Sequence, residues 1–281
     1  MSEENFSQTV PLEARDPYTL RVNLSEGISE SGLKNALESG ETGFLHSFTT
    51  GSAVDGPGVR LVAWTTGCQF RCLYCHNPDT WKIRNGMPVP LKRATEEVAK
   101  YRGGLKIMGG GFTLSGGEPL MQDRFAVRLF ESVKQMEIHT ALDTNGALGN
   151  RVSDNEMKFI DLVLLDIKTW DNENHIRLTG VKVDAVKEFA QRLSDLRKPV
   201  WLRYVLVPDL TDNLPDISRL AEFAAGLGNI ERVDVLPFHQ LGEYKWKELG
   251  MDYKLSGLEP PSAEKIRSVV DCFRNAGLNA I

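Results

Sequence analysis

Three of the chain's four cysteines lie within eight residues, in the stretch GCQFRCLYCHNPDTW. Cys68, Cys72 and Cys75 form a C-x3-C-x2-C spacing, which lets one loop wrap three thiolates around a compact cluster. A 4Fe-4S cluster ordinarily takes four cysteines, so three leave one iron open to a substrate. The fourth cysteine, Cys272, is distant in sequence, and we expect it in the core, on the apolar face of the last helix.

Two other uses of the three thiols compete with an open iron site. A closed zinc site needs four ligands, and His76 adjoins Cys75, so it would have difficulty reaching the same metal. Burial of the cysteines as small hydrophobic side chains is disfavoured because Gln69 and Arg71 make the stretch too polar for a core segment. The spacing therefore favours an iron-sulfur cluster.

The elements that must position this loop alternate between strands and helices. Strands are predicted over 60–66, 111–116, 139–144, 161–168, 200–207 and 232–238, and helices over 31–40, 91–101, 183–196 and 261–278. Such alternation predicts a parallel α/β sheet, either doubly wound or curled into a barrel. Polar residues gather after the strands, as in barrel active sites, which favours a partial (β/α)6 TIM-like barrel that is open on one side.

Composition and charge exclude several classes of protein. The 281 residues are 41% hydrophobic and 25% charged, and the longest apolar runs are far shorter than a bilayer span. Residues 1–40 hold seven acidic and three basic side chains, which leaves 31 acidic against 30 basic in the rest of the chain. Without a basic stripe we expect no nucleic-acid partner, and we expect no membrane partner and a cytoplasmic location. We predict a flexible N-terminal extension over 1–40 and one core domain over 41–281.

Several motifs resemble a known family. The pattern C-x3-C-x-aromatic-C, with Tyr74 as the aromatic residue, and the stretch LSGGEP resemble the radical S-adenosylmethionine (SAM) superfamily. More narrowly, DGPGVR, CLYCHNPDTW, SGGEPL, LDTNG, LLDIK, RYVLVP, LPFHQLGEYKW and YKLSGLEPP occur in the order found in pyruvate formate-lyase activating enzymes, which are activases of glycyl-radical enzymes. The resemblance runs from about Gly43 to near the C-terminus.

The resemblance implies a function and its cofactors. SAM would chelate the open iron of the 4Fe-4S cluster, and one electron would cleave it to methionine and a 5'-deoxyadenosyl radical. That radical would take a hydrogen atom from a glycine of pyruvate formate-lyase, the protein substrate. Flavodoxin or ferredoxin is the implied electron donor, and we expect a monomer.

The resemblance also implies roles for individual residues. The expected catalytic residues are Cys68, Cys72, Cys75, Lys168 and Asp55. The expected SAM-binding residues are Tyr74, Cys75, His76, Gly116, Gly117, Asp143, Asp166, Ile167, Lys168 and His239. A sodium or potassium ion (Na+ or K+) is expected on Asp143, Thr144 and Asp166, beside the SAM carboxylate.

Each expected site residue also has a plain structural interpretation. Tyr74 would be a half-buried aromatic, the glycine pair a turn, Asp55 an Asx cap and His239 a structural histidine. Lys168 would be a lysine emerging into solvent. Asp143 and Asp166 would bind strand-end amides or pair with Lys168.

Two competing functions stay open. One is activation of another glycyl-radical enzyme, such as a glycerol or choline lyase. Many activases of that kind carry an additional cysteine-rich insert, and KIRNGMPVPLKRATEEV contains no cysteine, which favours the pyruvate formate-lyase type. The other is a non-catalytic electron carrier or zinc-binding module, which leaves the glycine pair and Lys168 unexplained.

Overall fold

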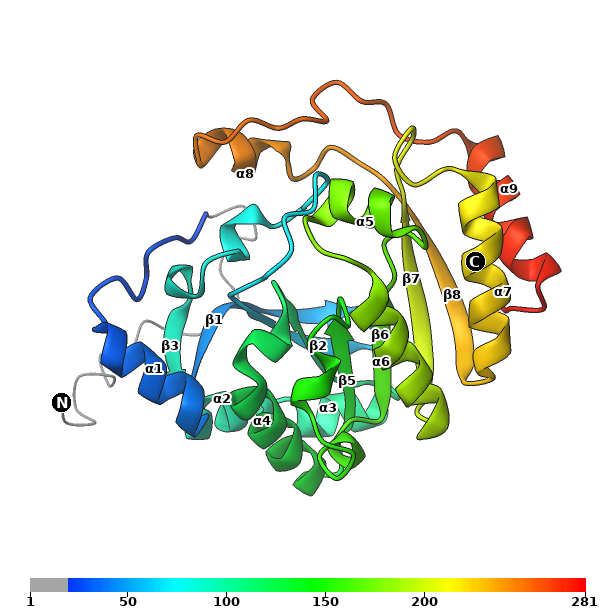
Figure 1. The fold of residues 1–281 in the computed structure, drawn as a ribbon. Coiled ribbons are helices and arrows are strands. Elements are labelled where there is room, and N and C mark those ends of the chain that lie inside the picture. Colours follow the sequence, from blue (N-terminus) through cyan, green and yellow to red (C-terminus); the bar gives the residue numbers. More distant parts are fainter. Residues whose placement is uncertain (1–19) are drawn as a thin grey trace. The chain divides into compact units, whose positions relative to one another are not determined.

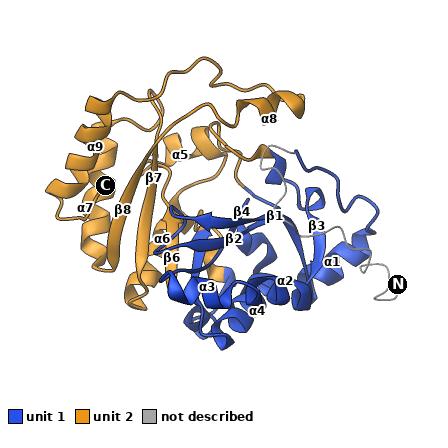
Figure 2. Ribbon diagram, turned by 180° about the vertical axis from the view of Figure 1, so that it is seen from behind, with its two compact units in different colours: residues 1–69, 79–143, 151–161 blue, residues 70–78, 144–150, 162–281 orange. Residues whose placement is uncertain are grey.

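The structure is a computed structural model that describes residues 20–281. The chain divides into two compact units, each made of separate stretches of sequence (Figure 2). Unit 1 comprises residues 1–69, 79–143 and 151–161, and unit 2 comprises 70–78, 144–150 and 162–281. Cys68 therefore belongs to unit 1, whereas Cys72 and Cys75 belong to unit 2.

From residue 20 onward, unit 1 contains five strands in the hydrogen-bonded order β3-β1-β2-β4-β5. Strands β2, β4 and β5 are parallel, and β1 runs antiparallel to both β2 and β3. The strands are β1 (Thr42–Ser52), β2 (Arg60–Thr65), β3 (Met87–Pro90), β4 (Gly111–Gly116) and β5 (His139–Thr144). The helices are α1 (Glu30–Ser39), α2 (Leu91–Ala99), α3 (Arg102–Ile107) and α4 (Asp123–Gln135), and α1 and α2 both pack on α4.

Unit 2 contains three parallel strands in the order β6-β7-β8. They are β6 (Leu162–Asp166), β7 (Val200–Leu206) and β8 (Ile230–Pro237). The helices are α5 (Asn172–Thr179), α6 (Asp184–Asp195), α7 (Leu214–Leu227), α8 (Glu243–Glu248) and α9 (Ala263–Asn275). Helices α7 and α9 pack together beside β8 (Figure 1).

The α/β class is confirmed, and neither unit closes its strands into a circle. All six predicted strands are present, as β2 and β4 to β8. The count of six was wrong because β1 and β3 add an antiparallel edge to unit 1. The β3 sequence MPVP contains two prolines, which fit only an edge strand and conceal it from pattern analysis.

The predicted helices are confirmed as α1, α2, α6 and α9. Helix α9 begins after Ser262, whose side chain accepts a hydrogen bond from the Lys265 amide, as an N-cap should. Cys272 lies on this helix but is only half-buried, so the prediction of a core position was wrong. Its sulfur lies 3.3 Å from the Ser218 hydroxyl on α7, at the margin of the apolar face. No helix within 20–281 is long and apolar enough to cross a membrane.

The predicted extension over 1–40 has two parts. Residues 1–19 lie outside the described residues. From residue 20 onward the segment contacts the rest of unit 1, since Arg21 donates to the His46 carbonyl (3.0 Å) and the Ser25 amide to the Arg84 carbonyl (3.1 Å). Helix α1 follows and ends at Gly40 in the left-handed conformation (φ 67°). The domain boundary at residue 40 stays a prediction.

Candidate active site

The two ends of the cysteine loop are tied together in unit 1. The loop leaves β2, and the amide of Gly67 donates to the Thr80 carbonyl (2.7 Å) while the amide of Cys68 donates to the Trp81 carbonyl (3.1 Å). Thirteen residues after Cys68 the chain thus returns to the same place, as a loop that encloses a cluster must. Backbone bonds of this kind hold Cys68 in position without help from its side chain.

A buried side-chain pair anchors the returning end of the loop. Asp79 is fully buried, and its carboxylate lies 3.0 Å from Nε2 of His46 on β1. Since a carboxylate only accepts, Nε2 of His46 carries the proton and its Nδ1 is left to face the Ser47 hydroxyl at 2.8 Å. The Asp79 carbonyl also accepts from the Asn85 side chain (2.7 Å). Sequence reasoning did not single out His46 or Asp79.

The middle of the loop is held in unit 2 by the end of α5. The Arg71 amide donates to the Thr179 carbonyl (2.8 Å), and the Leu73 amide donates to the Leu178 carbonyl (3.0 Å). A turn then brings the Cys75 amide to the Cys72 carbonyl (3.0 Å). Burial raises the pKa of the Cys72 thiol to about 12, although the charge of Lys168 works in the opposite direction.

Lys168 lies next to the cysteine loop within unit 2. Its ammonium is 3.0 Å from the Asp166 carboxylate and 5.7 Å from the centre of the Tyr74 ring. Burial lowers the pKa of Lys168, but Asp166, Tyr74 and Cys72 together outweigh it, so the pKa stands well above the ordinary value. The side chain is 9% exposed, so the interpretation of a lysine emerging into solvent was wrong. The alternative pairing with Asp166 is present.

Tyr74 covers this part of unit 2 with a buried hydroxyl. The oxygen has no hydrogen-bond partner among the residues that the structure describes. Burial is also the main reason that its pKa is raised well above the ordinary value. A buried hydroxyl normally finds a partner, so the group is suited to meet a ligand beside Lys168. Ile167, between Asp166 and Lys168, is buried at 1% exposure.

The chemistry of the three thiols fits an iron-sulfur cluster. None of the three forms a disulfide, and thiolates are the usual ligands of such clusters. Between residues 20 and 281, no group of three His, Cys, Asp or Glu side chains is arranged to hold a metal ion. The three thiols are divided between units that are described separately, so their convergence on one cluster remains a prediction.

The glycine pair after β4 is required by the protein's own backbone. Gly116 has φ 131°, and a Cβ there would lie 2.2 Å from the backbone of Thr65. A Cβ on Gly117 would lie 2.5 Å from the Gly67 carbonyl. The Gly117 amide donates to the Thr65 carbonyl (2.9 Å), so the pair joins the end of β4 to the start of the cysteine loop. These contacts explain the glycines without a ligand.

The residues expected to bind a monovalent cation have partners of their own. The Asp143 carboxylate accepts from the Ser115 hydroxyl (2.6 Å) in unit 1. In unit 2 the Thr144 hydroxyl accepts from the Gly146 amide (3.0 Å), and Asp166 pairs with Lys168. A cation site on these groups stays a prediction.

Two expected SAM-binding histidines come together in unit 2. The rings of His76 and His239 meet edge to face, with their centroids 4.9 Å apart. Both side chains are exposed, and Nδ1 of His239 accepts from the Leu241 amide (3.4 Å). An exposed aromatic pair beside the cysteine loop can stack on a flat ligand ring.

Comparison with known proteins identifies the family. Residues 62–221 match the Radical SAM superfamily. The chain is 45% identical over 244 residues to the pyruvate formate-lyase-activating enzyme of Staphylococcus epidermidis, which covers 84% of this chain and 96% of that protein. The enzyme of the same name from Staphylococcus aureus USA300 is 45% identical over 233 residues, which is 80% of this chain and 93% of that one. The chain belongs to the pyruvate formate-lyase-activating enzyme family of the radical SAM superfamily. Membership implies an iron-sulfur cluster and SAM.

Solved structures agree with this radical SAM fold. A domain of pyruvate-formate lyase-activating enzyme from Bacteroides vulgatus aligns with a TM-score of 0.52 at 25% identity, over 62% of this chain and 98% of that one. SuiB of Streptococcus suis, bound to its precursor peptide SuiA, aligns with a TM-score of 0.57 at 20% identity, over 78% of this chain and 47% of SuiB. The α/β fold of the chain is that of partial TIM-like radical SAM barrels.

Asp55 lies in the DGPGVR stretch of unit 1 that precedes β2. Asp55 precedes the first residue of β2 in the chain, and Cys68 follows its last residue. Its carboxylate accepts from the Ser52 hydroxyl (2.5 Å), and its carbonyl accepts from the Thr113 hydroxyl (2.7 Å). Those contacts fit the alternative of an Asx cap, and a role of Asp55 in the activase stays a prediction.

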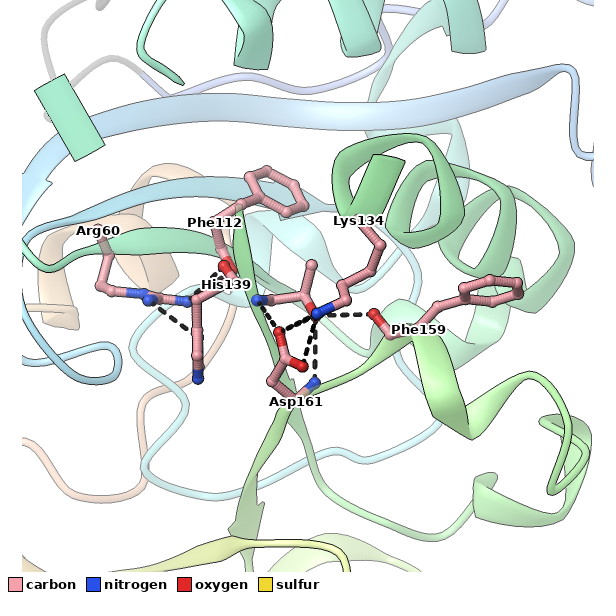
Figure 3. Close-up of polar contacts among 7 residues, drawn as sticks. Arg60, Phe112, Lys134, His139, Phe159 and Asp161 are labelled. Carbon is pink, nitrogen blue, oxygen red and sulfur yellow. Dashed lines mark hydrogen bonds and ion pairs between the residues drawn. The ribbon is translucent and has the colours of Figure 1, made fainter. Parts of the chain in front are cut away.

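A buried arginine fastens the DGPGVR turn to the next two strands. Arg60 is fully buried, and its guanidinium donates to the Thr113 hydroxyl (3.0 Å) and to the Phe112 carbonyl (2.7 Å). It also faces Nδ1 of His139 at 3.3 Å, next to the bonds from Lys134 to Asp161 (Figure 3). Because arginine only donates, Nδ1 of His139 is the acceptor. Arg60 thus has a structural role at the end of the strands remote from Cys68.

Sequence reasoning missed one cation of the radical SAM core. Arg203 lies on β7, in register with Asp166 on β6, and is only 9% exposed. The sequence feature that could have indicated Arg203 is a charged residue in the otherwise apolar run VWLRYVLV. A charge inside such a strand needs a partner, and that requirement could have directed attention to it.

Proposed function

We propose that this chain is the activase of pyruvate formate-lyase: it cleaves SAM reductively and installs a glycyl radical on that enzyme. The observation that carries the proposal is the 45% identity to proteins of that name over nearly their full length. The three cysteines outside disulfides, and the buried lysine close to Tyr74 in their loop, provide the groups that this chemistry requires.

Cys68, Cys72 and Cys75 are proposed to hold the 4Fe-4S cluster and leave one iron without a protein ligand. When bound, the cluster supplies the electron that cleaves SAM. The protein supplies position and electrostatics. The backbone bonds at Cys68 and the turn between Cys72 and Cys75 keep the thiols in place, which reduces the ordering needed when the cluster binds.

Lys168 is proposed to bind the SAM carboxylate. Its ammonium is charged at any physiological pH because its pKa is raised, and it has donors beyond the one facing Asp166. The Tyr74 hydroxyl and the His76–His239 pair would meet the nucleoside part, and the backbone at Gly116, Gly117 and Ile167 would line the site. Asp143, Thr144 and Asp166 are proposed to hold Na+ or K+ beside the same carboxylate.

The protein substrate is proposed to enter as a glycine-bearing loop of pyruvate formate-lyase. We further propose flavodoxin or ferredoxin as the electron donor, a monomeric state and a cytoplasmic location. The donor must deliver single electrons because SAM cleavage consumes one electron per event.

The test is anaerobic incubation of cluster-loaded protein with SAM, a reductant and pyruvate formate-lyase, read by electron paramagnetic resonance. A glycyl radical with stoichiometric 5'-deoxyadenosine is expected, and the Cys75→Ala variant is the matched control. A radical formed on a glycerol or choline lyase but not on pyruvate formate-lyase would replace the proposed substrate. SAM cleavage without a radical on any of these proteins would refute activase function.

A further inference from the structure

A buried carboxylate binds the chain directly after Lys168 within unit 2. Asp216, in the first turn of α7, is 4% exposed. One oxygen of its carboxylate, Oδ2, accepts hydrogen bonds from the Thr169 hydroxyl (2.6 Å) and the Trp170 amide (2.9 Å). These bonds join the segment after β6 to the start of α7 across 47 and 46 residues of sequence. Asp216 therefore fixes both a side chain and the backbone next to Lys168.

Asp216 is itself held in place by its own helix. Its amide donates to the side-chain oxygen of the N-cap residue Asn213 (3.1 Å). Its other carboxylate oxygen, Oδ1, accepts from Arg219, three residues further along α7 (3.1 Å). The positive end of the helix dipole also stabilises a carboxylate in the first turn. These partners compensate for the burial of the charge, and they leave Oδ2 facing residues 169–170.

Two helices hold the side chain of Trp170 as well. Its indole packs against the Phe223 ring of α7, with centroids 4.9 Å apart. The ammonium of Lys187 on α6 lies 3.5 Å from the centre of the indole ring. Because the ring is held by both helices, the Trp170 amide loses little further freedom when it binds Asp216.

Lys168 lies just beyond the paired part of β6. The pairing of β6 with β7 ends with Asp166 opposite Arg203. Lys168 follows two residues later, where Asp166 holds its ammonium at 3.0 Å and Asp216 holds the chain that follows it. A long side chain meets a ligand in a defined direction only if the backbone that carries it is fixed.

We propose that Asp216 is a positioning residue for Lys168: by holding residues 169–170, it directs the ammonium of Lys168 at the SAM carboxylate. The inference rests on the proposed function, because it presumes that Lys168 binds that carboxylate. Asp216 acts on SAM only through Lys168. Its loss should therefore weaken only the part of SAM binding that the carboxylate contributes.

The test compares Asp216→Ala, Asp216→Asn and the control Asp212→Ala in cluster-loaded protein. Equilibrium binding is measured for SAM and for decarboxylated SAM, which lacks the group that Lys168 binds. We expect Asp216→Ala to weaken the binding of SAM roughly tenfold and to change that of the decarboxylated compound by less than about twofold. Asp216→Asn keeps a side-chain oxygen acceptor and should recover most of the loss. Asp212 pairs with Lys265 on α9 (3.1 Å), so its alanine variant should match the wild type for both compounds.

A double mutant separates positioning from general damage to the site. If Asp216 acts through Lys168, adding Asp216→Ala to Lys168→Met should weaken SAM binding no further than Lys168→Met alone. The inference is overturned if the effects of the two single changes add. It is also overturned if Asp216→Ala weakens the binding of both compounds equally, or binds SAM as tightly as Asp212→Ala.

Thermal unfolding of the cluster-free variants checks that each is folded. Should Asp216→Ala not fold, Thr169→Val removes one of the two donors to Oδ2 and replaces it, with a smaller loss expected for SAM and again none for the decarboxylated compound. A wild-type protein that binds SAM but forms no radical on pyruvate formate-lyase would refute the proposed function alone.

Discussion

The ammonium of Lys168 lies 3.0 Å from the carboxylate of Asp166, at the end of β6. The same ammonium faces the ring of Tyr74, between two of the clustered cysteines. One buried cation therefore links the end of a strand to the cysteine loop within unit 2. The pair leaves part of the charge of Lys168 available to an anionic ligand, which is the basis of its proposed role.

Replacing Lys168 with methionine should weaken SAM binding by roughly tenfold to a hundredfold, the usual cost of losing a hydrogen bond to a charged group. Equilibrium binding to cluster-loaded protein measures the effect. Lys182→Met, an exposed lysine of the same unit, is the control. Equal SAM affinity of the two variants would remove Lys168 from the site.

The cysteines should divide into two classes. Alanine at position 68, 72 or 75 should abolish the iron-sulfur chromophore and SAM cleavage, because a cluster already short of one protein ligand loses another. Cys272→Ala should keep both, since that thiol faces Ser218 between α7 and α9. Iron and sulfide analysis after anaerobic reconstitution decides the matter, and loss of the cluster from Cys272→Ala would contradict the three-thiol site.

The contact between His46 and Asp79 should hold the returning end of the cysteine loop. His46→Leu removes the hydrogen bond from Nε2 of His46 to the buried carboxylate of Asp79, at a cost of about 1–3 kcal/mol in the free energy of unfolding. His46→Gln retains an N–H donor and should recover much of that loss. Denaturant unfolding of the cluster-free protein measures both, together with the iron bound after reconstitution. Equal stability of the two variants would show that the contact does not matter.

The stability of the protein should depend on the protonation of His139. Burial, followed by the positive charge of Arg60, lowers the pKa of His139 below its ordinary 6.5, with a smaller contribution from Lys134 and an opposing one from Asp161. The neutral ring therefore stabilises the fold above pH 6.5, and that stabilisation is lost as the pH falls through the lowered pKa.

His139→Asn supplies an acceptor that does not titrate. Below pH 6.5 the free energy of unfolding of this variant should fall less steeply with pH than that of the wild type. The difference between the two slopes should correspond to the uptake of about one proton at most on unfolding. Denaturant titrations between neutral and acidic pH provide the comparison. Parallel slopes would show that His139 does not titrate on unfolding.

The sequence by itself determined the chemistry and the class of fold. The spacing of Cys68, Cys72 and Cys75 is a local feature of the sequence, and so is the alternation of strands and helices. Both can therefore be recognised from the sequence alone. The six parallel strands and the polar residues that follow them were predicted for the same reason. The motifs were sufficient to identify the family, because each consists of particular residue types at fixed separations along the chain.

Only the tertiary structure decided which distant residues support the site. His46 meets Asp79 across 33 residues, and Trp246 meets Cys75 across 171, and neither pair has a local pattern. Strand β1, which carries His46, was hidden because its pairing is antiparallel and its sequence TGFLHSFTTGS lacks a clear alternation. Such contacts depend on how the elements pack, and packing is a property of the whole chain.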